Sequence, residues 1–98
     1  MTEKRTLYYG PPIGIYDPRA FDTFVRSNVV DELLKIGSKS ACSVEVESAS
    51  SIMYHFPLAG IGLRYMAPSQ GRCIVEMLGT RKKEMDDITR FIFETDNN

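Results

Sequence analysis

The chain has 98 residues, of which 43% are hydrophobic and 26% are charged, and these values exclude wholesale disorder. The length suits one domain over residues 1–98 with a single continuous core. The formal net charge of −1 argues against a nucleic-acid partner, because such proteins usually carry a basic excess that neutralises phosphates.

The first half of the chain predicts a strand followed by one long helix. Residues 6–9 (TLYY) are aromatic and β-prone, and Gly10 with the two prolines after it ends them. Asp17 is a suitable helix cap, Pro18 suits the first helical position, and Gly37 is the expected end. Between them apolar residues recur at helical spacing, and a central Ser-Asn pair could divide the helix in two. The predicted buried stripe comprises Phe21, Val25, Val29, Leu33 and Ile36, and Phe24 and Leu34 widen it.

The second half predicts an antiparallel meander of strands. We expect three strands, over residues 41–48, 52–66 and 72–78, with the middle one long and bent; a turn at residues 57–62 would give four instead. The last of these strands is almost continuously apolar, which is typical of a central position in a sheet. The strand residues expected in the core are Val44, Val46, Val75 and Met77.

A final helix is expected after Gly79, with Thr80 as its cap. Its predicted buried stripe comprises Met85, Ile88, Phe91 and Ile92. The order of strand, helix, antiparallel meander and helix predicts the α+β class, with the helices packed on one face of the sheet. This order resembles the ferredoxin-like plan without its usual last strand, or with that strand supplied elsewhere. ACT-like and NIL-like regulatory modules share such plans, but a shared fold alone implies no function.

The sequence offers no catalytic constellation, no metal site and no sign of a cofactor. Cys42, Cys73 and His55 are the only soft metal ligands besides methionine, and they lack the closely spaced pairs of a structural zinc site. Both cysteines fall on the apolar phase of their strands and are expected to be buried thiols; a metal site shared with a second chain is the alternative. His55 falls on the opposite, wetter phase, which argues against a catalytic Cys–His pair.

Two segments are candidates for ligand binding. Three cations occupy the first turn of the predicted final helix, where the helix dipole favours an anion; neutralisation by nearby carboxylates is the alternative. The second segment is the glycine-bearing loop after the first strand, whose tyrosines could instead cover the edge of the core. With three meander strands the two segments lie at the same end of the sheet. The predicted ligand-binding residues are Gly10, Gly14, Tyr16, Thr80, Arg81, Lys82 and Lys83.

Residues 58–63 (LAGIGL) are apolar and uncharged, which makes a poor exposed edge. We therefore expect a two-fold homodimer with Leu58, Ile61 and Leu63 at its interface. The alternative is that the chain's own final helix or first strand covers this segment.

These features favour a small non-enzymatic binding or regulatory module, homo-oligomeric, that recognises a small anionic ligand or a protein partner. Two alternatives stay open: a small enzyme or enzyme subunit whose site a neighbouring chain completes, and an assembly partner within a larger complex. The polar start of the chain and the lack of a long apolar stretch predict a cytoplasmic protein without a membrane partner.

Overall fold

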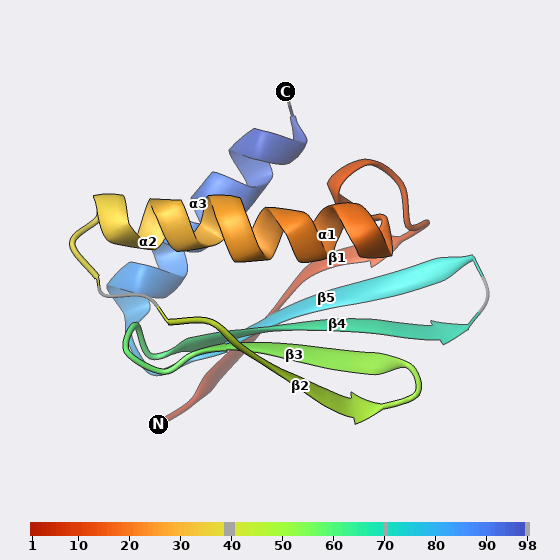
Figure 1. Ribbon diagram of the computed structural model, residues 1–98, viewed down its shortest axis with the longest axis horizontal. Coiled ribbons are helices and arrows are strands. Elements are labelled where there is room, and N and C mark those ends of the chain that lie inside the picture. The colour runs from red at the N-terminus through yellow and green to blue at the C-terminus, as the bar shows by residue number, and fades with distance from the viewer. Residues whose placement is uncertain (39–40, 70, 98) are drawn as a thin grey trace.

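The computed structural model describes residues 1–38, 41–69 and 71–97. Its strands form one antiparallel sheet in the order β1-β5-β4-β3-β2, and Figure 1 shows the helices on one side of that sheet. The class is α+β, as predicted. The strands are β1 (Glu3–Gly10), β2 (Ser43–Ser48), β3 (Ser51–Phe56), β4 (Ile61–Ser69) and β5 (Arg72–Gly79). The helical elements are η1 (Gly14–Tyr16), α1 (Pro18–Phe24), η2 (Val25–Val29), α2 (Val30–Lys35) and α3 (Lys82–Asp96).

The meander has four strands, so the predicted single bent strand over residues 52–66 is wrong. The backbone N–H of Ala59 donates to the carbonyl of Phe56 at 3.1 Å, and a tight turn joins β3 to β4. Gly60 completes this turn with a φ of +69°, a conformation that residues with a Cβ rarely adopt. A Cβ at Gly60 would also come within 3.0 Å of the Thr80 hydroxyl oxygen. This turn therefore requires glycine at position 60.

The fourth meander strand changes the place of β1 in the sheet. β1 pairs antiparallel with β5, with Glu3 opposite Gly79 and Gly10 opposite Cys73, and it occupies one edge. A split βαβ unit requires parallel strands, whereas each strand pairing in the described part of the chain is antiparallel. The ferredoxin-like arrangement is therefore not confirmed.

The long helix begins and ends where the sequence predicts. A side-chain oxygen of Asp17 accepts hydrogen bonds from the backbone N–H groups of Arg19 and Ala20, both at 3.2 Å, and Gly37 ends the helix with a φ of +85°. The Ser-Asn pair lies within η2, a π-helical turn, so the helix widens there and continues. The predicted cap of α3 is wrong, because Arg81 holds the cap position and makes no side-chain capping bond.

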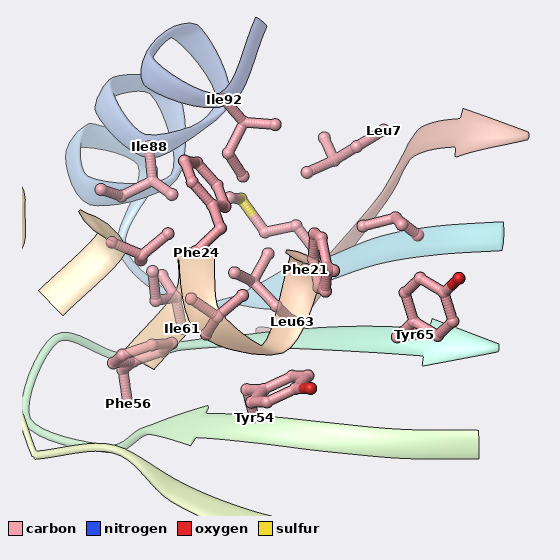
Figure 2. Packing of buried hydrophobic residues seen from close by; sticks show 14 of the residues in the cluster. Leu7, Phe21, Phe24, Tyr54, Phe56, Ile61, Leu63, Tyr65, Ile88 and Ile92 are labelled. Carbon is pink, nitrogen blue, oxygen red and sulfur yellow. The ribbon is translucent and has the colours of Figure 1, made fainter. Parts of the chain in front are cut away.

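The core lies between the helices and the sheet face that they cover (Figure 2). The predicted core residues that are buried there include Phe21, Val25, Leu33, Val75, Met77, Ile88 and Ile92, which confirms that part of the prediction. Ile36 and Phe91 are only partly buried, and Val44 and Val46 are exposed over 36% and 72% of their surface. The two valines belong to the outer strand β2, all six residues of which are exposed. The predicted core positions of these two valines are therefore wrong.

Candidate binding surfaces

The two halves of the predicted anion site lie at opposite ends of the sheet. Gly10 is the last residue of β1, and Gly14 and Tyr16 follow it, whereas Thr80 and the three cations follow the end of β5 (Figure 1). Because β1 and β5 run antiparallel, the two segments are separated by about one strand length, roughly 24 Å at about 3.4 Å per residue. The prediction that they share one end is wrong, since it depended on three meander strands.

The cations at the start of α3 are each paired within the chain. Lys82 Nζ lies 2.7 Å from a carboxylate oxygen of Asp86, and Lys83 Nζ lies 3.0 Å from one of Asp87. The Arg81 guanidinium donates to a backbone carbonyl at 3.2 Å. The lysine hydrogen bonds lower the pKa of both aspartates below its usual value. This arrangement supports the alternative interpretation, in which the carboxylates offset the cations.

The tyrosines of the loop after β1 pack against the core. The rings of Tyr8 and Tyr16 stack with their centroids 3.7 Å apart, and Tyr16 is buried. The Tyr65 hydroxyl donates to the Tyr16 carbonyl at 2.7 Å, and burial raises the pKa of Tyr16 to about 12. The Tyr8 hydroxyl donates to the Pro11 carbonyl at 2.7 Å. Tyr8 and Tyr16 therefore close one end of the core, and the Tyr8 hydroxyl is already engaged within the chain.

The predicted dimer interface is largely internal. Ile61 and Leu63 are buried in the core, whereas Leu58 on the turn between β3 and β4 is exposed. β4 lies between β3 and β5, so it is not an edge strand, and the chain's own helices cover its apolar face. The side chains of Ile61 and Leu63 are therefore buried within the chain and do not present an interface, while the expected homodimer stays a prediction.

Cys73 and His55 lie on opposite faces of the sheet. Cys73 is buried in the core, where desolvation raises the pKa of its thiol. His55 is opposite Gly62 on β4, on the face without helices, and Cys42 is half-buried just before β2. A Cys–His catalytic pair cannot form across the sheet. Among residues 1–38, 41–69 and 71–97, no three His, Cys, Asp or Glu side chains gather so that they could hold a metal ion.

The uncovered face of the sheet, which we call the open face, carries a ladder of charged side chains. Glu76 contacts Lys4 on one side at 3.6 Å and Arg64 on the other at 3.3 Å. Arg64 continues across β3 to Glu47, with its Nε and Nη2 atoms 2.8 and 3.0 Å from the two carboxylate oxygens. Only 8% of Glu76 is exposed. The sequence did not predict this ladder. The one signal of it was Glu76, a single glutamate within the apolar run of β5.

A second feature of the open face is a hollow near the turn between β3 and β4. Its volume is about 300 Å³, and its floor includes Gly62, which lies between His55 and Leu78 in the strand register. Met53 and Thr80 also line it. Thr80 is thus the one predicted ligand-binding residue that borders this hollow, while the importance of Gly62 was not recognised from sequence.

A smaller cavity of about 200 Å³ lies between the start of α1 and the turn from β2 to β3. Tyr54 and Tyr65 line it, together with Pro18 and Ile52. The Tyr54 hydroxyl donates to a carboxylate oxygen of Asp22 at 2.8 Å, and the Tyr65 hydroxyl is likewise bonded. The two tyrosine hydroxyls at this cavity are therefore satisfied by the chain itself.

The edge strand β2 is the most exposed element of the sheet. Val44 and Val46 face the side of the helices, opposite Tyr54 and Ile52, while Glu45 and Glu47 lie on the open face. The alternation itself was predicted from the sequence, but the exposure of both faces was not.

Comparison of the chain with protein-family models, with curated proteins and with solved structures finds no match. Among the described residues, no helix has the length and apolar character needed to cross a membrane.

Proposed function

We propose that the chain is a non-enzymatic protein-binding module that adds an extended segment of a partner protein beside β2. The observation that carries this proposal is the exposure of β2: it is an outer strand, all six of its residues are exposed, and two of them are valines. An outer strand leaves backbone N–H and C=O groups unpaired along one side, and these can bind another strand.

The other edge of the sheet is less suited to strand addition. The pairing of β1 with β5 shifts register between Thr6 and Tyr8, as at a β-bulge, and such irregularities protect an edge. β1 also begins with charged residues, and Arg5 is held by Asp86 of α3 at 2.8 Å. In β2 the register shift comes only after Val46, at the end of the strand. The two edges therefore differ, and β2 is the more accessible.

The alternation along β2 indicates what kind of segment it would bind. Residues opposite Val44 and Val46 would be apolar, and the residue opposite Glu45 would be a cation, since opposite charges stabilise cross-strand pairs. A second copy of β2 is a poorer match. The antiparallel register that pairs both valines of one copy with both of the other also places Glu45 opposite Glu45. This like-charge contact favours a different protein over a homodimer through β2.

A pair of short synthetic peptides tests the proposal: one alternates valine with lysine, and the other alternates valine with glutamate. In amide NMR spectra the valine–lysine peptide should shift the signals of β2 and bind at least about tenfold more tightly, a difference of about 1.4 kcal/mol. The charge-reversed variant Glu45→Lys should prefer the valine–glutamate peptide.

The double variant Val44→Thr/Val46→Thr keeps the branched side-chain shape but removes the apolar surface, so it should weaken peptide binding. Leu58→Thr is the matched control, because Leu58 is 53% exposed and lies on the turn between β3 and β4, outside β2. Equal binding of both peptides by the wild type would contradict the proposal. A dimer in light scattering that the double variant dissociates would replace the partner protein with a second copy.

A further inference from the structure

The hollow on the open face has a glycine floor that the fold does not explain. Gly62 is the second residue of β4, with His55 beside it on β3 and Leu78 beside it on β5. A glycine inside a strand weakens the strand, because it loses more conformational freedom on folding and contributes no side chain to packing. Such a glycine needs a reason.

The backbone conformation does not supply that reason, and packing supplies only part of it, because a side chain at this position would require Met53 to move by a few tenths of an ångström. Gly62 has no positive φ. A Cβ there would meet first the sulfur of Met53, at 3.2 Å, which is the flexible end of a side chain. The comparison with Gly79 is instructive, because a Cβ on Gly79 would come within 2.8 Å of Met85 and 3.0 Å of the Gly60 carbonyl. Gly79 is required for close packing, whereas Gly62 leaves space at the surface that a ligand can approach.

The lining of the hollow defines the chemistry of that ligand. No lysine, arginine, aspartate or glutamate is among the described residues that line it, and Met53 and Leu78 give it apolar walls. The polar groups are the hydroxyls of two threonines, one of them Thr80, and the imidazole of His55. A volume of about 300 Å³ is at the lower end of the range for small-molecule sites.

The neighbour of His55 decides how its ring can bind. Nε2 lies 2.8 Å from a carboxylate oxygen of Glu45. An ionised carboxylate only accepts hydrogen bonds, so the neutral ring carries its proton on Nε2 and leaves Nδ1 as an acceptor. A ligand that donates one hydrogen bond and is otherwise apolar matches this site.

We propose that the hollow binds a small uncharged heterocycle with an N–H donor, which packs its ring over Gly62 and donates to Nδ1 of His55. Met53 and Leu78 contact the ring, and Gly62 provides the space for it. The ligand would lie over β3, β4 and β5 and needs no partner protein, but the site shares Glu45 with β2, because the Glu45 carboxylate holds Nε2 of His55.

Indole is a suitable probe, and 1-methylindole is its control because the methyl group removes the N–H donor. The chain contains no tryptophan, so the fluorescence of indole can be followed directly. We expect saturable binding with a dissociation constant of about 1 mM, as for other ligands of this size. The NMR shifts should centre on the amides of Gly62, His55 and Leu78. 1-Methylindole should bind several-fold more weakly.

Two variants separate the roles of the floor and the imidazole. Gly62→Leu fills the hollow and should abolish binding, whereas Thr6→Leu adds the same side chain elsewhere on the open face and should not. His55→Phe keeps a flat ring but removes the acceptor, so it should bind indole and 1-methylindole equally. Because this comparison does not involve Gly62, it decides the question even if Gly62→Leu fails to fold. Non-saturable binding, unchanged binding by a folded Gly62→Leu, or equal binding of the two probes by the wild type would overturn the proposal.

Discussion

The neighbours of Glu47 hold its carboxylate in the charged form. Its carboxylate accepts two hydrogen bonds from Arg64 and one from the Ser51 hydroxyl, the last at 2.7 Å. These bonds favour the charged form and lower the pKa of Glu47 to about 2. The sequence placed Glu45 and Glu47 on one strand face, but it could not reveal the arginine two strands away.

The stability of the fold should depend on pH through this carboxylate. Its pKa is lower in the folded chain than the value of about 4.3 in an unfolded one, so its contribution is complete above about pH 4.3 and is lost as the pH falls towards 2. In Arg64→Met the pKa of Glu47 should rise towards 4.3 in a carboxyl NMR titration. Arg90→Met, which removes an arginine paired with Asp87 instead, should leave it unchanged. A Glu47 titration near pH 4 in the wild type would show that the ion pair does not form in solution.

At the scale of elements, the long helix presents a sharp division between its two faces. Leu33 is fully buried against the sheet, while the adjacent Leu34 is 57% exposed. The helical period of 3.6 residues accounts for this difference, because neighbouring residues point about 100° apart. The periodicity of the sequence predicted Leu33 as part of the buried stripe for the same reason, whereas the prediction that Leu34 widens this stripe is wrong.

Truncation of each leucine tests the orientation of this helix. Leu33→Ala should lower the free energy of unfolding by about 2–5 kcal/mol, because it leaves a cavity in a packed core. Leu34→Ala should change it by no more than about 0.5 kcal/mol, as most surface substitutions do. Chemical denaturation measures both values. Similar costs for the two variants would contradict the orientation of α2.

At the scale of the whole molecule, the sheet and the helices enclose one face of β4. Ile61 lies within this core, between strands β3 and β5 and beneath the helices (Figure 2). If Ile61 were at an interface, a charged residue in its place would disrupt only a dimer. Because Ile61 lies in the core, the same substitution should disrupt the fold itself. The effect of an Ile61 substitution on folding therefore distinguishes the observed four-stranded meander from the predicted three-stranded one.

Ile61→Lys should unfold the chain or lower its melting temperature severely, because it buries an unpaired charge. Leu58→Lys should leave the melting temperature nearly unchanged, since Leu58 is exposed on the preceding turn. Circular dichroism during heating compares the two. A folded Ile61→Lys variant that only changes the oligomeric state would restore the original interface.

Local signals account for the parts of the fold that the sequence determined. The Asp17 cap, the Gly37 stop and the apolar stripe of the long helix depend on residues close together in the chain, so their physical causes are visible in it. The strand character of β2 and β5 and the inward position of Cys73 follow from alternation and apolar runs in the same way.

Only the tertiary structure decided how these elements combine. The turn at Gly60 divides the predicted bent strand into β3 and β4, so the meander has four strands and β5 runs antiparallel to β1. Gly10 and Arg81 therefore lie at opposite ends of the sheet, as Figure 1 shows for the ends of β1 and β5. Pairing partners far apart in sequence determined which valines are exposed and which charges meet on the open face. The hollow over Gly62 likewise exists because three strands bring His55, Gly62 and Leu78 into one row. Register and strand order are properties of the assembled sheet, and no local pattern specifies them.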